Sequence, residues 1–182
     1  TTGRAFGSSS LGGYWSGWLL CSNTGAGKAP RSVSGIHCWD NLNDGLYGNS
    51  HSWIGGINGA RAGVVLPATR TIVGIQLARD LGGESYRHGD RAGATITVMY
   101  SATANSDATP WASSSGWTSA GSISGWAANT PNYYLFSTPV KADGLRITIA
   151  KRGTCVDELE IYAVKEYTLM NEALTWHDAG AA

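Results

Sequence analysis

Four segments of the chain alternate apolar and polar residues with a period of two. Apolar side chains occupy every second position in residues 73–77, 96–100, 145–149 and 159–163. Successive side chains of a strand point to opposite faces of a sheet, so each segment predicts a strand with one buried face. We expect eight side chains to point inward: Ile75, Leu77, Ile96, Val98, Leu145, Ile147, Leu159 and Ile161.

The segments between these predicted strands are rich in turn-forming residues, and no repeat of fixed length is visible. Strands that bury one face are typical of antiparallel sheets packed as a sandwich. The lack of a repeat argues against a propeller or a solenoid. The pattern therefore predicts an all-β, antiparallel sandwich. We expect residues 1–163 to form one domain and residues 164–182 to be a linker or docking tail outside it.

The composition of the chain argues against nucleic acid and membranes as binding partners. The 182 residues contain 13 Lys and Arg against 13 Asp and Glu, so the formal net charge is zero. A neutral chain has no general attraction for nucleic acid or anionic lipid. Hydrophobic residues reach 42% and charged residues 14%, which argues against disorder. No apolar run is long enough to cross a bilayer, so we expect no membrane insertion.

Three segments resemble the coagulation-factor type C, or discoidin, domain family. They are the turn at residues 41–45 with Trp53 after it, the strand pair at 72–80 and 94–101, and the closing strands at 144–149 and 157–162. The resemblance covers roughly residues 36–163, whereas residues 1–35 match poorly. It implies a galactose-binding-like jelly roll, similar to bacterial carbohydrate-binding modules. Fucose-binding members carry an Arg-x-Asp motif after a His, but here Arg79 and Asp80 are adjacent, so that branch is not supported.

The same resemblance implies one structural calcium ion between the Asp-Gly turn and the last strand. Its ligands would be oxygen atoms, as calcium prefers, with backbone carbonyls near Leu42 completing the set. The side chains carried over are Asp44, Asn49, Ser52 and Glu158. The alternative is that these side chains only bind turn amides.

The cysteine count is odd: Cys21, Cys38 and Cys155. If the resemblance holds, the Asp-Gly turn and the last strand are neighbours. The resemblance then implies a disulfide between Cys38 and Cys155, with Cys21 free. A shorter loop, closed by Cys21 and Cys38, remains open as the alternative. Together with the low Lys content, the cysteines favour an extracytoplasmic, secreted or cell-surface protein.

The loop at residues 84–91 is the densest polar and aromatic cluster in the sequence. It lies between two predicted strands, so we expect it at one rim of the sandwich. Sugars are bound by directional hydrogen bonds and by an aromatic face, which this loop supplies. The candidate glycan contacts are Glu84, Tyr86, Arg87, His88 and Arg91, with Trp126 as a stacking platform. A loop that satisfies its own polar groups is the equal alternative.

The remaining tryptophans divide by context. Trp53 and Trp117 lie next to strand patterns and are expected in the core, whereas Trp111, like Trp126, lies in a polar loop that favours exposure. Catalytic motifs are missing: there is no Gly-x-Ser-x-Gly elbow and no His-Glu-x-x-His. The sequence therefore favours a non-catalytic module that binds a glycan or polysaccharide. The alternative is a structural or adhesion module that packs on proteins or on copies of itself.

Overall fold

The computed structural model describes residues 3–15, 18–21, 25–28, 35–48, 50–81 and 91–164, with only the backbone given for residues 13–15 and 18–20. Within them the regular elements are eleven strands and one short 3-10 helix, η1. Their bounds are β1 Arg4–Gly7, β2 Gly13–Trp15, β3 Trp18–Cys21, β4 Gly27–Lys28, η1 Trp39–Asn43, β5 Trp53–Ile54, β6 Arg61–Leu77, β7 Ile96–Ser101, β8 Thr118–Ile123, β9 Asn132–Ile149, β10 Cys155–Val156 and β11 Leu159–Ala163.

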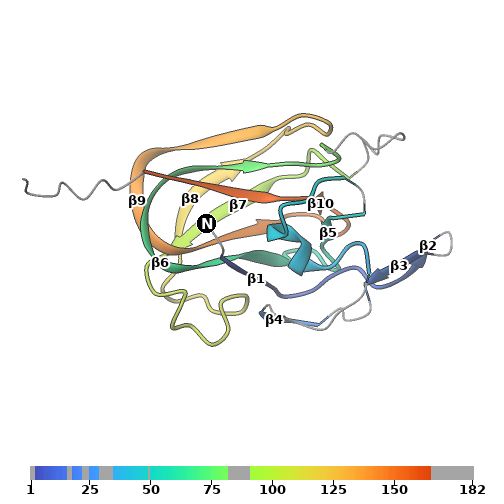
Figure 1. Ribbon diagram of the computed structural model, residues 1–182, viewed down its shortest axis with the longest axis horizontal. Coiled ribbons are helices and arrows are strands. Elements are labelled where there is room, and N and C mark those ends of the chain that lie inside the picture. Colours follow the sequence, from blue (N-terminus) through green and yellow to red (C-terminus); the bar gives the residue numbers. More distant parts are fainter. Residues whose placement is uncertain are drawn as a thin grey trace, which may run out of the picture.

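Two long strands, β6 and β9, build the sandwich. They pair with each other along most of their length, and both curve around one end of the molecule (Figure 1). Their side chains are exposed at the curve, near residues 67–69 and 137–139, and the register shifts there. The second half of β6 and the first half of β9 form one layer with β11. The other halves form the second layer with β1, β4, β7 and β8.

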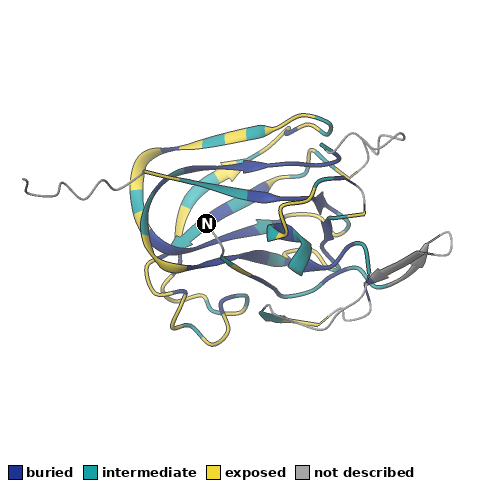
Figure 2. Cartoon of the chain, viewed as in Figure 1, coloured by how far each residue is buried: buried dark blue, intermediate teal, exposed yellow. Residues whose placement is uncertain are grey.

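The predicted alternation is confirmed by burial. Seven of the eight side chains expected inside are at most 2% exposed, and Ile161 is partly buried against the same core. Figure 2 shows buried residues along the inner strands and exposed residues at the curve. Trp53 and Trp117 are buried, as expected. The model is an all-β jelly-roll sandwich, and no helix in the described residues is long and apolar enough to span a bilayer.

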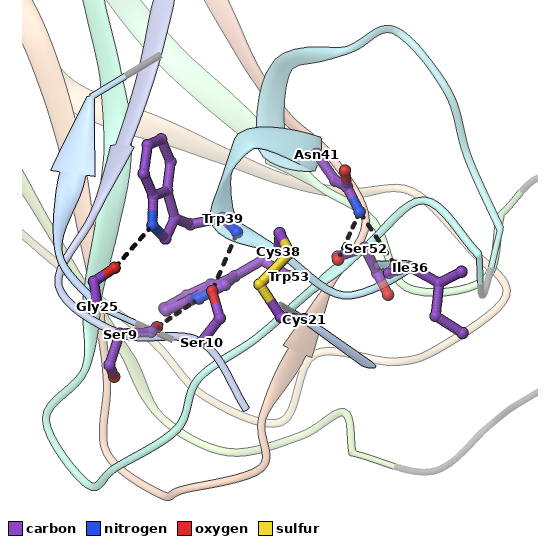
Figure 3. Close-up of a disulfide and its surroundings, with 10 residues drawn as sticks. All are labelled: Ser9, Ser10, Cys21, Gly25, Ile36, Cys38, Trp39, Asn41, Ser52 and Trp53. Atoms are coloured by element: carbon purple, nitrogen blue, oxygen red, sulfur yellow. Dashed lines mark hydrogen bonds between the residues drawn. A yellow bond between two sulfur atoms is a disulfide. The ribbon is translucent and has the colours of Figure 1, made fainter. Parts of the chain in front are cut away.

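The disulfide differs from the predicted one. Cys21 at the end of β3 is bonded to Cys38, just before η1, with the two Cα atoms 5.3 Å apart (Figure 3). The predicted pair of Cys38 and Cys155 is therefore wrong. Cys155 pairs with Ile54 in the β5–β10 ladder instead. Its thiol is buried and free, and burial raises its pKa to about 12.

The region around this disulfide is held to the sandwich by hydrogen bonds from two buried tryptophans. The Trp39 indole N–H donates to the Gly25 carbonyl at 3.2 Å, and the Trp53 indole N–H donates to the Ser9 carbonyl at 2.9 Å (Figure 3). Each indole buries a large apolar area and still satisfies its one donor. These contacts attach the N-terminal segment, which matched the family poorly, to the core.

Candidate functional site

The loop predicted to contact sugar lies between two anchored flanks. Its first flank is held where the Asp157 backbone N–H donates to the Ala78 carbonyl at 2.8 Å, and its second where the Cys155 N–H donates to the Arg91 carbonyl at 3.0 Å. Both ends of the loop are thus fixed to the same short segment around β10. Because they lie at the end of the sandwich opposite the curve of β6 and β9, the flanks are at a rim.

The structure places only some of the predicted sugar contacts. Glu84, Tyr86, Arg87 and His88 lie outside the described residues, so their prediction stays a prediction. Arg91 is exposed at the rim, and its backbone has a φ of 67°. Asp80, on the other flank, has a φ of 56°. Left-handed backbone is costly for residues other than glycine and is frequent at functional sites.

Neighbouring loops are joined to the Arg91 flank by a series of hydrogen bonds. Gly55 donates to the Thr154 carbonyl at 3.1 Å, and Gly153 donates to the Gly55 carbonyl at 2.9 Å. The Arg152 N–H donates to the Asn58 side chain at 2.7 Å. The turns at residues 55–59 and 150–154 therefore form a fixed base. On this base, Arg152 and Lys151 are exposed near Arg91, so the described part of the rim is cationic.

Trp126 is not a sugar platform. It is 5% exposed, belongs to the main core, and donates its indole N–H to the Ala94 carbonyl at 2.8 Å. Its polar loop suggested exposure, but the ring closes the end of the sandwich and its donor is satisfied there. Trp111 is likewise partly buried, packed against a small cluster around Phe6 and Trp117.

An anchor that the sequence did not reveal is Asp157. This carboxylate is fully buried, and its Oδ2 accepts hydrogen bonds from the backbone N–H groups of Gly48, Asp80 and Leu81. Its Oδ1 lies 3.6 Å from Nη1 of the buried Arg79. Burial raises its pKa to about 6, although the Arg79 charge and the three amides oppose that shift. Asp157 therefore joins the Asp-Gly loop to the base of the rim loop.

The next residue, Glu158, is in the opposite situation. It is 5% exposed, its Oε1 accepts a hydrogen bond from Gly45 N–H at 3.3 Å, and its buried Oε2 has no hydrogen-bond partner among the described residues. Burial and the nearby charge of Asp44 raise the Glu158 pKa to about 8. Burial also raises the pKa of Asp44, while His51, 3.6 Å away, opposes that shift.

The acidic pair, Asp44 and Glu158, lines an open pocket of about 570 Å³ beside β11. Apolar side chains including Val64, Leu66 and Ile161 share its walls with three carboxylates, and no Lys or Arg lines it. Glu158 and Glu160 alternate with apolar residues, a pattern that by itself would place both on the surface. Glu158, which precedes β11, is buried instead, whereas Glu160 on β11 is partly buried.

The predicted calcium ligands fit the structure in part. Asp44 and Glu158 lie together, and the unsatisfied Glu158 oxygen suits a hard cation. Ser52 is buried, and its Oγ lies 2.6 Å from Nδ1 of His37, so its hydroxyl is already engaged. Asn49 lies outside the described residues. No cluster of three or more His, Cys, Asp or Glu side chains able to hold a metal is found in the described part of the chain, so backbone carbonyls would have to complete a site.

No family model and no curated protein matches the sequence. Solved structures do match. SpGH29 has a TM-score of 0.51 and 16% identity over 73% of this chain. The family 32 carbohydrate-binding module of C. perfringens NanJ, solved with galactose, has a TM-score of 0.51 and 15% identity over 70%. The fucolectin from striped bass (Morone saxatilis) serum has a TM-score of 0.59 and 12% identity over 90%.

These likenesses establish the fold. The chain spans 25% of SpGH29 and 47% of the fucolectin, but 86% of the NanJ module. At such identities the shared property is the galactose-binding-like jelly roll, which confirms the fold implied by the sequence resemblance.

Proposed function

We propose that this chain is a non-catalytic carbohydrate-binding module of a secreted or cell-surface protein. The observation that carries the proposal is the rim, where two flanks of one polar loop and two further turns are fixed together on a jelly roll of the kind used by sugar-binding modules. A rigid base of this kind holds short polar side chains in place for directional hydrogen bonds to sugar hydroxyls.

The rim residues supply suitable chemistry. Arg91 and Arg152 present planar guanidinium groups, which donate paired hydrogen bonds to neighbouring oxygen atoms. Asn58 is exposed beside them and supplies both a donor and an acceptor. The loop that ends at Arg91 also contains the predicted contacts Glu84, Tyr86, Arg87 and His88. Such a shallow site binds with a Kd on the order of 0.1 to 1 mM, or about 4 to 5.5 kcal/mol.

The buried polar pairs support a non-catalytic role. Ser52 and His37 are hydrogen bonded, but both are buried, so a substrate does not reach them. Asp157 is occupied by Arg79 and three amides, and a carboxylate held this way does not serve as a general acid or base. Asp44 and Glu158 line the pocket beside β11, and none of the exposed rim cations Arg91, Lys151 and Arg152 lines that pocket.

We also propose a structural calcium ion at the acidic pair. Asp44 and Glu158 would bind it, with backbone carbonyls of the loop near Leu42. The ion would neutralise two carboxylates that otherwise repel each other, and it would satisfy the buried Glu158 oxygen. Its part is to order the loop that follows η1.

An extracytoplasmic location agrees with the disulfide of Cys21 and Cys38, because such bonds persist in oxidising compartments. The parent protein would then present the module to glycans outside the cell. The adhesion alternative requires association with proteins or with other copies, and sedimentation of the isolated chain tests it.

A glycan array followed by calorimetry tests the proposal. We expect a defined set of saccharides to bind, and Arg91→Ala to weaken the best of them at least tenfold, with the melting curve of the variant recorded beside that of the wild type. Lys141→Ala, an exposed cation at the opposite end of the sandwich, is the matched control and leaves binding unaltered. No binding across the array, with self-association of the chain, would support the adhesion alternative instead.

A further inference from the structure

The outer face of the layer formed by β11, β6 and β9 carries an exposed tyrosine and an exposed leucine beside partly buried Tyr162 and Glu160 and the buried Gln76. Tyr133 is 63% exposed and Leu135 is 72% exposed, although both lie within a strand of the sandwich. Tyr162 on β11 lies on the same face, with its ring centre 6.1 Å from that of Tyr133. We call Tyr133, Leu135, Tyr162, Gln76 and Glu160 the tyrosine strip.

Strand register explains how the tyrosine strip is built. Gln76 on β6 lies between Tyr133 and Glu160, and Gly74, two residues earlier, lies between Leu135 and Tyr162. Gly74 cannot be replaced by a larger residue, because a Cβ there would lie 2.5 Å from the Tyr134 carbonyl oxygen. Gly74 thus lets the β9 backbone approach β6 closely, and the Tyr133 and Tyr162 rings lie 6.1 Å apart on this face.

Polar groups are concentrated beside the rings. The Tyr162 hydroxyl donates to Glu160 Oε2 at 2.9 Å, and the Tyr47 hydroxyl donates to the other oxygen of Glu160. Gln76 Nε2 lies 3.5 Å from the Tyr47 hydroxyl. The network holds the carboxylate and the hydroxyls in fixed positions next to an exposed ring, which is the combination that a sugar ring and its hydroxyl groups require.

The tyrosine strip begins at the rim. Asn132, the first residue of β9, donates to the Ala127 carbonyl at 2.8 Å and accepts a hydrogen bond from Ala127 N–H at 2.9 Å, which fixes the rim turn to the strand. Tyr133 follows immediately, and the strip then continues along β9 toward the curve. A glycan chain that follows β9 from this turn would meet the exposed Tyr133 ring first.

Charge selects the kind of glycan. Glu160 is the single charged side chain of the tyrosine strip, and it is an anion. It repels uronic acid and sulfated chains, whereas neutral sugars meet only hydrogen-bonding and apolar groups. The rim, with Arg91, Lys151 and Arg152 exposed, has the opposite charge.

We propose that the tyrosine strip is a second glycan-binding surface, which extends the rim site and takes the internal units of a linear neutral polysaccharide. The proposal rests on the function proposed above. It predicts that chain length matters, because a monosaccharide contacts the rim alone and a longer chain contacts both surfaces.

Calorimetry with defined sugars tests this. The probes are galactose, glucose, mannose and their linear neutral hexasaccharides, with hexagalacturonate as the anionic comparison. We expect a neutral hexasaccharide to bind at least tenfold more tightly than its monosaccharide. Hexagalacturonate is expected to bind no more tightly than galacturonate, because Glu160 repels it from the tyrosine strip. Tyr133→Ala is expected to remove the tenfold gain and to leave monosaccharide binding and the melting temperature unchanged, whereas Tyr133→Phe keeps the ring and the gain.

Three results would overturn the proposal: equal affinity for monosaccharide and hexasaccharide, an unaltered gain in Tyr133→Ala, or self-association of the wild type that Tyr133→Ala abolishes. In the first two cases, monosaccharide binding that is lost in Arg91→Ala leaves the rim function standing. If Tyr133→Ala removes hexasaccharide binding and Arg91→Ala does not alter it, the strip stands and the rim fails. If the wild type binds no saccharide, both fail.

Discussion

Two carboxylates adjacent in the sequence, Asp157 and Glu158, lie in regions of opposite character. Asp157 has a guanidinium partner and three backbone donors, so its charge is compensated within the fold. Glu158 accepts a hydrogen bond from Gly45 N–H and has an acidic neighbour in Asp44. Each carboxylate has one buried oxygen without a hydrogen-bond partner among the described residues, but that of Asp157 lies 3.6 Å from the Arg79 guanidinium. The comparison shows that burial alone does not indicate a structural role. Asp157 faces a cation of the fold itself, whereas the proposed calcium ion would supply the positive charge beside Glu158.

The largest difference between the two regions is expected when each carboxylate is replaced by its amide. Asp157→Asn removes the negative charge that lies 3.6 Å from the buried Arg79, and we expect the free energy of unfolding to fall by about 3–5 kcal/mol. In chelator at neutral pH, folded Glu158 keeps its proton because its pKa is about 8. Glu158→Gln, the matched control, therefore replaces one neutral group by another and costs little or stabilises the fold. Denaturant titration of both variants measures the difference, and equal losses would contradict the contrast between the two regions.

Removing the disulfide tests what holds the loop that carries Asp44. Cys21 and Cys38 are separated by 17 residues, and their bond fixes the start of η1, immediately before that loop. We expect the double variant Cys21→Ala, Cys38→Ala to lose about 3 kcal/mol of unfolding free energy. Thermal melting measures the loss.

Thiol labelling provides the control for that variant. In the denatured, unreduced wild type one thiol is expected to react, and peptide mapping is expected to place it at Cys155. In the native protein none is expected to react, because burial raises the Cys155 pKa to about 12. Label on Cys21 would instead support a bond between Cys38 and Cys155.

Calcium and pH are expected to change the stability of the folded state by a smaller amount, and this change depends on Glu158. In chelator, folded Glu158 keeps its proton up to a pKa of about 8, whereas the unfolded chain loses it near 4.5. The folded state therefore binds more protons between these values, and its stability falls as pH rises through that range. Calcium at a hundred times its Kd would add about 2.7 kcal/mol at the upper end and flatten the fall.

Melting curves at several pH values, with calcium and with chelator, check this prediction. Glu158→Gln serves as the control, because it removes the Glu158 part of the pH-dependent fall and the response to calcium. The part due to Asp157, whose pKa is raised to about 6, remains at lower pH. Identical curves in calcium and chelator for the wild type would remove the proposed ion.

The sequence predicted the sandwich well because period-two alternation is a local property. Ile75, Leu77, Ile96 and Val98 point inward as the alternation requires. The site depends on contacts between distant segments, which alternation does not encode. The Asp157 carboxylate accepts hydrogen bonds from the backbone N–H groups of Gly48 and Asp80, which lie in loops more than 70 residues away along the chain.

Local composition also misled in two places. Trp126 lies in a polar loop, yet its ring packs in the main core at the end of the sandwich and its indole N–H donates to Ala94. The cysteine pairing was inferred from a family likeness, whereas the position of β3 beside η1 decided it. In both cases the side chain's position depends on a contact with a distant residue, Ala94 for Trp126 and Cys21 for Cys38.

The central claim, that a glycan binds at the rim, is tested most directly by nuclear magnetic resonance with amide-labelled protein and a saccharide found on the array. Titrating a monosaccharide is expected to shift the backbone amide signals of Arg91, Asn58 and Arg152, and to leave those of residues 137–141 at the curve unmoved. Shifts confined to the curve, or no shifts at millimolar sugar, would contradict the claim.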